Sequence, residues 1–213
     1  MTTEQLNPFP MPSALELVLL SELVKVARTC YGRGWSYGTA GNFSLRGRGG
    51  IVWQSPSGLN KGALNPTQFI PIDLSTATVI WPAAASPVRP SQEMAVHLGI
   101  YRADPCALTV VHTHPPHLVR QSRSGEVLVF QGEEMQKHLG CADHLQTLRL
   151  PVLPNPTPAA MPALTQGVAG HIVPGVPLVI LAGHGVYAWA KTPMEALSFI
   201  EAAEFLCQTR GST

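Results

Sequence analysis

The sequence of 213 residues predicts an α/β domain built in layers. Short apolar runs with the two-residue period of strands alternate with segments whose apolar residues recur every three or four positions, as in helices. The chain is long enough for one domain with a sizeable core, and no apolar run reaches membrane-spanning length. We therefore expect a single domain over residues 13–213, preceded by a flexible tail over residues 1–12.

The composition of the chain limits the partners that it can bind. It has 14 basic and 13 acidic side chains, so its net charge of +1 gives no electrostatic reason to expect a nucleic acid or a membrane as partner. Charged residues make up 13% and hydrophobic ones 45%, which favours burial of surface in an oligomer. The four cysteines form no Cys-x-x-Cys pair and no signal peptide precedes them. This predicts reduced thiols and a cytoplasmic location.

The first half of the chain is predicted to begin with a helix. Ser13 and Glu16 form a capping box, and apolar residues from Leu15 to Cys30 then recur at helical spacing, so that the helix ends near Gly32. The segments that follow are predicted as strands at 51–54, 69–73 and 78–81, and as a helix that is capped by Ser91 and continues through Arg102.

The second half continues the alternation. Thr192, a proline and a capping glutamate predict the start of the last helix, whose apolar stripe faces the core. The other predicted elements are a strand at 109–114, a helix at 117–123, a strand at 126–130, a short helix at 132–139 closed by Gly140, a strand at 148–153, a helix at 164–171, and strands at 177–184 and 186–190.

Three histidines at the ends of two predicted strands indicate a metal site. His112 and His114 share one face of a strand that two prolines end, and His184 lies between two glycines at the end of the strand 177–184. Three protein ligands and an open position are typical of a catalytic metal site rather than a structural one. His117 is a rival for the third ligand position, and histidines that are merely hydrogen-bonded are the alternative for all of them.

Two polar turns and two glutamates are further candidates. The segments Gly38–Ser44 and Ser55–Lys61 offer backbone amides, hydroxyls and one ammonium, which can cradle a phosphate but are equally ordinary as surface turns. Glu93 is expected in the first turn of a helix, and Glu134 at a junction between a strand and a helix. Either glutamate can be a solvated cap or a catalytic acid/base.

The chain resembles the class II aldolase/adducin-head superfamily over about residues 13–208. Five short motifs, which occur in the same order as in that superfamily, carry the resemblance. The motifs are Thr39–Ser44, Ser55–Gly58, Pro90–Glu93, His112–His114 and Gly183–Gly185. The resemblance implies a three-layer fold in which helices flank a central, largely antiparallel sheet. It also implies a homotetramer whose active sites lie between neighbouring subunits and take a small sugar-phosphate substrate.

The resemblance assigns roles to individual residues. It makes His112, His114 and His184 the ligands of a divalent metal ion. Three imidazoles suit Zn²⁺ best, one ion per subunit, with Fe²⁺, Co²⁺ and Mn²⁺ as alternatives. The resemblance also implies six phosphate-binding residues, namely Thr39, Gly41, Asn42, Ser57, Gly58 and Ser91.

Within the superfamily, the stretch Gln131–Lys137 is similar to the sugar-phosphate dehydratases of methionine salvage. That similarity implies that Glu134 is catalytic, whereas the sugar-phosphate aldolases rely on the glutamate that matches Glu93, here a secondary acid/base. Both are present, so an aldolase or epimerase remains the alternative, and a non-catalytic scaffold like the adducin head is the alternative of another class. For proton transfer near neutral pH, we expect Glu134 in a desolvated cleft with a raised pKa.

Overall fold

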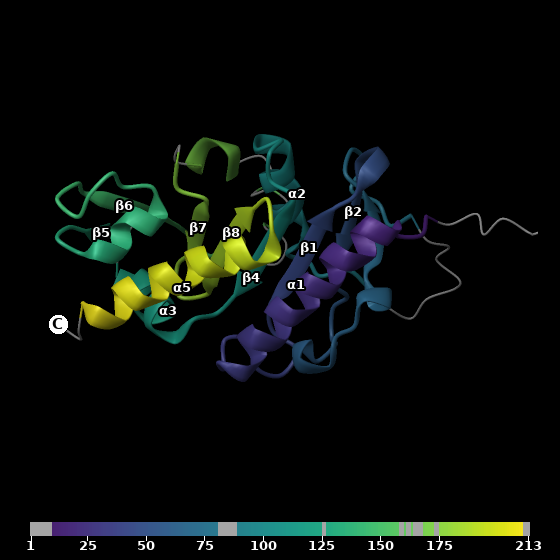
Figure 1. Cartoon of the computed structure of the whole chain (residues 1–213), viewed down its shortest axis with the longest axis horizontal. Coiled ribbons are helices and arrows are strands. Elements are labelled where there is room, and N and C mark those ends of the chain that lie inside the picture. Colours follow the sequence, from purple (N-terminus) through teal and green to yellow (C-terminus); the bar gives the residue numbers. More distant parts are fainter. Residues whose placement is uncertain are drawn as a thin grey trace, which may run out of the picture.

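The computed structural model of the chain describes residues 10–80, 89–124, 127–157, 160, 163, 168–172 and 175–210. Within this part, eight strands form one sheet in the order β3-β2-β1-β4-β8-β7-β6-β5, with the β4–β8 pair near its middle (Figure 1). All neighbouring strands are antiparallel except β6 and β7. The strands are β1 Asn42–Arg46, β2 Ile51–Gln54, β3 Ile70–Asp73, β4 Thr109–Thr113, β5 Val127–Phe130, β6 Leu148–Leu153, β7 Leu178–Leu181 and β8 Gly185–Ala190.

Helices cover both faces of this sheet. The α-helices are α1 Ala14–Gly32, α2 Met94–Ala103, α3 Pro116–Gln121 and α5 Pro193–Thr209. Short 3₁₀ helices connect the elements: η1 Arg48–Gly50, η2 Lys61–Ala63, η3 Pro66–Gln68, η4 Ser122–Ser124, η5 Glu134–Leu139 and η6 Val168–His171. Helices α1, α3 and α5 pack on one face and α2 on the other, which confirms the predicted three-layer α/β class with a largely antiparallel sheet.

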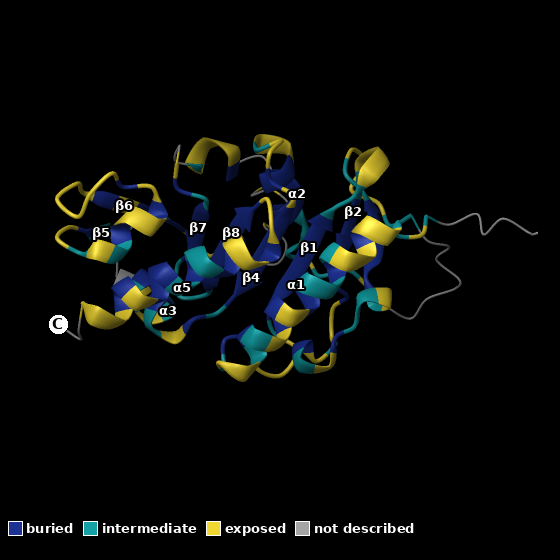
Figure 2. Cartoon of the chain, in the orientation of Figure 1, coloured by how far each residue is buried: buried dark blue, intermediate teal, exposed yellow. Residues whose placement is uncertain are grey.

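The alternation of side chains along the strands divides the core into two clusters. On β4, Val111 packs with α1 and α5, while its neighbour Val110 packs with α2. Strands β4, β7 and β8 are buried along their whole length, and the helices expose their outer faces (Figure 2). Because the period of a strand is two, His112 points to the same face of the sheet as Val110, toward α2.

Two of the predicted helix caps, Ser13 and Thr192, are confirmed, whereas Ser91 does not cap α2. The Ser13 side chain accepts a hydrogen bond from the backbone of Glu16, whose carboxylate accepts one from the backbone of Ser13, and α1 ends at Gly32. Thr192 caps α5 in the same way, accepting from the backbone N–H of Glu195 at 3.2 Å. These bonds satisfy amide groups that the first turn of a helix leaves free.

Three predicted elements end differently in the structure. The strand 177–184 stops at Leu181, because the pairing of Leu181 with Gly185 closes a hairpin and leaves residues 182–184 as its turn. Helix α2 begins only at Met94, since the Ser91 hydroxyl accepts from the backbone of Glu93 in a separate turn. Within 78–80 there is no strand but a single bridge at Val79.

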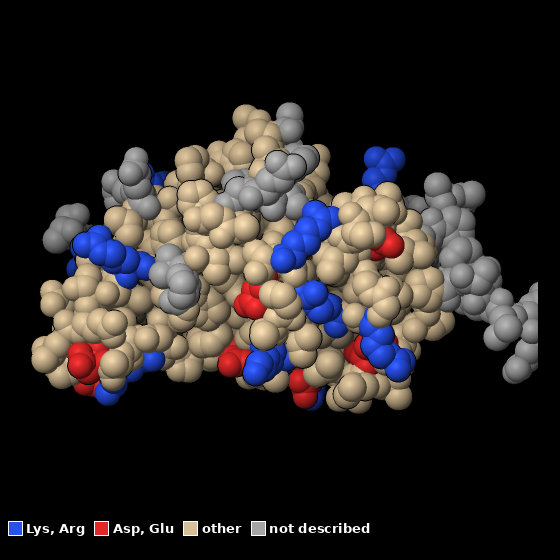
Figure 3. All heavy atoms as spheres, turned by 90° about the horizontal axis from the view of Figure 1, so that it is seen from above, with Lys and Arg blue, Asp and Glu red and all other residues tan. Residues whose placement is uncertain are grey.

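Several predictions fall partly outside the described residues. They concern residues 1–9 of the tail, Trp81, Glu126 of the strand expected at 126–130, positions 164–167 of the helix expected at 164–171, and residues 211–213 of the domain. Of the helix expected at 164–171, positions 168–171 form η6. Among the described helices, none is long and apolar enough to cross a membrane. All four cysteines are free thiols. On the face in Figure 3, basic and acidic side chains are interspersed on a mostly neutral surface.

Candidate active site

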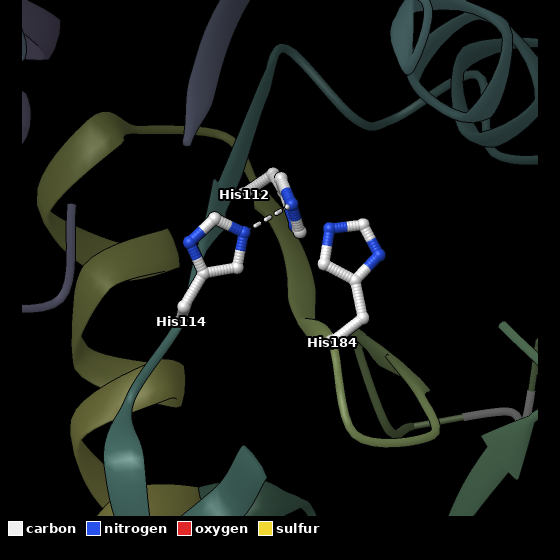
Figure 4. A group of neighbouring side chains, drawn as sticks. All are labelled: His112, His114 and His184. Carbon is white, nitrogen blue, oxygen red and sulfur yellow. Dashed lines mark hydrogen bonds between the residues drawn. The ribbon is translucent and has the colours of Figure 1, made fainter. Parts of the chain in front are cut away.

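The three predicted histidines meet at one edge of the sheet. His112 is on β4, His114 directly follows that strand, and His184 is in the turn of the β7–β8 hairpin (Figure 4). One nitrogen of each ring lies within 4.8 Å of the corresponding nitrogens of the other two, and Nε2 of His112 is 3.0 Å from Nε2 of His114. The placement of His184 on a strand was wrong, but the hairpin turn brings it to the same point.

Hydrogen bonds orient two of these rings. Nδ1 of His112 donates to the carbonyl of Val186 at 3.0 Å, and Nδ1 of His184 donates to Oδ1 of Asn155 at 3.1 Å. Each bond places the ring's proton on Nδ1, so that Nε2 presents a lone pair to the cluster. Burial lowers the pKa of His114 to about 3, which keeps this ring neutral. The donor set therefore fits a divalent cation held by three imidazole nitrogens.

Two glycines allow the rings to approach the backbone. A Cβ added at Gly185 would lie 2.5 Å from the Thr113 carbonyl oxygen and 2.6 Å from Cδ2 of His114. A Cβ at Gly41 would lie 2.9 Å from the carbonyl oxygen of His112. Real Cβ atoms do not come this close, so both positions require glycine for the cluster to form as it does.

Glu93, at the N-terminus of α2, is the acidic group beside this cluster. Its Oε1 is 2.8 Å from Nε2 of His184 and 3.6 Å from Nε2 of His112, and its Oε2 accepts a hydrogen bond from the side-chain amide of Asn42. Glu93 is therefore a carboxylate in direct contact with the histidines, and the Asn42 amide holds it there.

A cavity of about 490 Å³ opens beside Glu93 and His184. It forms because the loop after β2 lies against the segment before α2, where the backbone N–H of Ser57 donates to the carbonyl of Arg89 at 2.9 Å. Arg89 was not predicted as a site residue. A basic residue directly before the Pro90–Glu93 motif was the signal that could have indicated it. The lining residues are Ser57, Arg89, Pro90, Ser91, Gln92, Glu93, Asn155, Pro156 and His184.

The structure separates the six expected phosphate-binding residues into groups. Ser57 and Ser91 line the cavity together, and Gly58 follows Ser57 on the surface. Asn42 is instead 2% exposed on β1, and its side-chain amide is fully engaged by Glu93 and His97. Gly41 is buried against the backbone of His112, and Thr39 is exposed in the turn before β1.

Lys61 links the two polar turns instead of facing the cavity. Its Nζ donates to the carbonyl of Thr39 at 2.9 Å and to that of Leu59 at 2.8 Å, and the residue is 1% exposed. Burial lowers its pKa to about 8. The ammonium that the sequence offered as a phosphate ligand thus cross-links the turn before β1 to the loop after β2.

His117, the rival third ligand, lies outside the cluster. Its Nδ1 is 2.7 Å from Oε1 of Glu204 on α5, and the same carboxylate accepts from the backbone of His117 and Leu118. These bonds hold the start of α3 against α5. The geometry therefore favours His184 over His117 as the third ligand.

Glu134 has surroundings opposite to those expected. Its side chain is 69% exposed and forms ion pairs with Lys137 and, at 3.2 Å, with His144. The hydrogen bond from Lys137 lowers the pKa of Glu134. The expectation of a desolvated cleft and a raised pKa is wrong for this subunit, because neighbouring cations and water stabilise the charged carboxylate.

The topology also keeps Glu134 away from the histidines of its own chain. Four strand-to-strand steps separate β5 from β4, which carries His112, and two separate it from β7, which His184 follows; at about 4.8 Å each, these amount to roughly 19 and 10 Å. Moreover, β5 ends opposite Leu148, at the far end of β6 from the segment that carries Asn155. Figure 1 shows β5 and β6 at one end of the molecule. Within one subunit, Glu134 cannot reach the histidine cluster.

Comparisons with known proteins agree with this fold and site. The Class II Aldolase and Adducin N-terminal domain matches residues 21–210. Methylthioribulose-1-phosphate dehydratase of Methylococcus capsulatus is 35% identical over 190 residues, covering 87% of this chain and 89% of the relative. The enzyme of the same name from Sodalis glossinidius is 35% identical over 198 residues, covering 90% and 96%.

A solved structure shows the same architecture. L-fuculose-1-phosphate aldolase from Thermus thermophilus matches with a TM-score of 0.72 at 25% identity, covering 92% of this chain and 94% of that one. The matched region of the domain contains the histidine cluster, Glu93 and the cavity beside them. This chain therefore belongs to the class II aldolase and adducin N-terminal domain family.

Proposed function

We propose that this protein is a metal-dependent dehydratase that converts 5-methylthioribulose 1-phosphate to 2,3-diketo-5-methylthiopentyl 1-phosphate and water. The observation that carries the proposal is the cluster of three imidazole nitrogens within 4.8 Å of one another, one of which belongs to His184, a residue that lines a cavity together with Ser57, Ser91 and Arg89. Relatives that share about a third of their residues with this chain, over nearly their whole length, have this activity in their names. The reaction belongs to methionine salvage.

His112, His114 and His184 would hold the metal ion, and Zn²⁺ is the ion that three imidazoles fit best. When bound, the ion supplies a Lewis acid for the carbonyl oxygen of the substrate. The hydrogen bonds from His112 to Val186 and from His184 to Asn155 fix both rings in the ligating tautomer before any ion arrives.

The cavity suits the phosphate group. Ser57 and Ser91 present hydroxyls, and the guanidinium of Arg89 supplies positive charge. Gly58, which follows Ser57, remains a predicted part of the site. The turn at Thr39 and Gly41 remains a predicted part of this cradle, held near the Ser57 loop by Lys61. Asn42 remains predicted there too, although its side-chain amide already has two partners.

The reaction removes a hydrogen from carbon 3 and the hydroxyl from carbon 4, and the resulting enol becomes the ketone at carbon 3. A hydroxyl leaves readily only after it receives a proton, so an acid must stand next to carbon 4. We assign this transfer to Glu134 and a secondary acid/base role to Glu93. Because Glu134 cannot reach its own cluster, it would act in the site of a neighbouring subunit of a cytoplasmic homotetramer. Burial there would raise its pKa toward the working range.

An aldolase or epimerase is the second candidate, and the position of Glu93 favours it. Glu93 contacts the histidines from within the same chain, so it would stand beside a sugar phosphate bound at this cluster and could serve as its base. Such an enzyme would break the bond between carbons 3 and 4 instead of losing water, or would invert a carbon. The two candidates therefore differ in their products.

The decisive experiment is incubation of the metal-loaded protein with 5-methylthioribulose 1-phosphate. We expect diketone absorbance to appear with a release of water and without carbon–carbon cleavage. Mass spectrometry of the products separates the candidates directly. Cleavage fragments would reject the dehydratase in favour of the aldolase, and no product with any divalent ion would reject both.

A further inference from the structure

A continuous series of buried polar side chains runs from the active site into the core. The Asn42 amide donates to Glu93 through Nδ2 and meets Nε2 of His97 through Oδ1. Nδ1 of His97 is 2.7 Å from Oγ of Ser44, which is 2.8 Å from the hydroxyl of Tyr101. Asn42, Ser44, His97 and Tyr101 are each at most 2% exposed. At such burial, every polar atom without a partner destabilises the fold.

The series forms because a helix face meets a strand face. Glu93, His97 and Tyr101 follow one another at intervals of four residues, which places them on one side of α2 and its N-cap. Asn42 and Ser44 are two residues apart on β1 and point to the same face of the sheet. The two rows interlock, and the Glu93 carboxylate is the end that reaches the histidine cluster.

The orientation of the Asn42 amide fixes the direction of every bond. Its Nδ2 donates to Oε2 of Glu93, and its Oδ1 faces His97 and can only accept. His97 must then hold its proton on Nε2, and its Nδ1 accepts from the Ser44 hydroxyl. Oγ of Ser44 accepts in turn from Tyr101. Burial lowers the pKa of His97 to about 3, in keeping with a neutral ring that has one proton.

We propose that Tyr101, Ser44 and His97 are positioning residues of the active site. They orient the amide of Asn42, which holds one oxygen of Glu93, so that the other oxygen faces the imidazoles. All donors point toward Glu93, and a break anywhere leaves the Asn42 amide free to turn over and set its oxygen against the carboxylate. The kinetic part of this proposal rests on the proposed function, since it takes an oriented Glu93 to be required for turnover.

A spectroscopic test does not depend on any activity. Long-range ¹H–¹⁵N correlation spectra of the full-length protein at neutral pH report which ring nitrogen of each histidine bears the proton. The His97 signals are those that disappear in His97→Gln. We expect the Nε2–H tautomer. An Nδ1–H tautomer, or exchange between the two, would contradict the direction of the chain and overturn the proposal.

A matched pair of variants tests the consequence for catalysis. The longer amide of His97→Gln can place a donor where Nε2 stood, whereas that of His97→Asn is too short to reach Asn42. We expect His97→Asn to lower kcat roughly tenfold or more, with KM and bound metal little changed, and His97→Gln to recover most of the loss. His138→Gln, a change at an exposed histidine bonded to Ser198, serves as the control. Equal losses in the two variants would refute the donor role of His97.

Tyr101→Phe keeps the proposal testable if the His97 variants do not fold. It conserves the ring and removes only the hydroxyl that begins the chain, so we expect a folded protein whose kcat falls a few-fold at unchanged KM. An unchanged kcat would remove Tyr101 from the proposal. Failure of the wild-type protein to turn over the sugar phosphate would overturn the proposed function instead, and the tautomer of His97 would still decide the direction of the chain.

Discussion

Glu93 and Glu134 differ in burial and in how firmly their neighbours hold them. Glu93 is mostly buried, contacts two imidazoles and receives a hydrogen bond from an amide that is itself held in place. Glu134 is 69% exposed at the other end of the sheet and pairs with Lys137 and His144. The first is preorganised within one subunit. The second has the surroundings of a surface residue, so a catalytic role for it requires a second subunit to remove the water around it.

Removing a histidine should have the largest effect, because it removes the metal site beside Glu93. We expect His112→Ala, His114→Ala and His184→Ala each to lose bound metal and turnover, since two imidazoles hold a divalent ion poorly. Metal analysis of the purified proteins checks this. His117→Ala, which changes a histidine paired with Glu204, is the control and should keep its metal. The opposite result for His117 and His184 would show that the third ligand is wrongly assigned.

The ranking of the two glutamate variants tests the comparison itself. Glu134→Gln should keep the fold and the metal but lower kcat roughly a hundredfold or more, because an amide cannot transfer the proton. Glu93→Gln should have a smaller effect on dehydration. Turnover assays of both variants measure this, and the reverse ranking would favour the aldolase.

Mixing of inactive subunits shows whether Glu134 acts across an interface. An assembly of Glu134→Gln and His114→Ala subunits contains some sites with three histidines from one chain and Glu134 from another. We expect mixing, after dissociation and reassembly, to restore part of the activity, with sedimentation run at the assay concentration. A mixture as inactive as its components, or a fully active monomer, would contradict a shared site.

Substitutions in the cavity expected to bind the phosphate should raise KM more than they lower kcat. Ser57→Ala and Arg89→Met are expected to raise KM about tenfold with little change in kcat, because these contacts are made equally in the ground state and the transition state. Asn42→Ala should chiefly lower kcat, since its amide holds Glu93. Steady-state kinetics at constant metal content distinguish the two patterns. A normal KM in both cavity variants would remove the phosphate assignment.

The smallest expected effect is on the pH dependence of stability. It is tested by comparing Lys61, whose ammonium is buried, with Lys137, whose ammonium is half-exposed. The pKa of Lys61 is about 8 in the folded protein and 10.5 in the reference state, so between these values the unfolded chain binds more protons. The contribution of Lys61 to stability should therefore rise with pH across that window. Lys61→Met should abolish this rise, while Lys137→Met, at a half-exposed residue, should retain it. Urea midpoints measured from pH 7 to 10.5 check this, and equal slopes in wild type and Lys61→Met would contradict it.

The sequence by itself determined the features that depend on neighbours along the chain. The capping box at Ser13, the proline-led start of α5 and the two-residue spacing of His112 and His114 are local, and all three occur as predicted. Their energies come from bonds within one turn or one strand, which the order of residues specifies directly. The pattern also indicated His184 and an α/β domain, and the resemblance to the family added the three-layer arrangement with a largely antiparallel sheet.

Only the tertiary structure decided which side chains meet from distant parts of the chain. His184 lies in a hairpin turn because Leu181 pairs with Gly185, and Asn42 faces Glu93 and His97 because β1 lies beneath α2. The exposure of Glu134 follows in the same way from the place of β5 at the edge of the sheet. Strand order and register select among many contacts with similar local preference, so the surroundings and the charge state of each acidic group are properties of the packed chain.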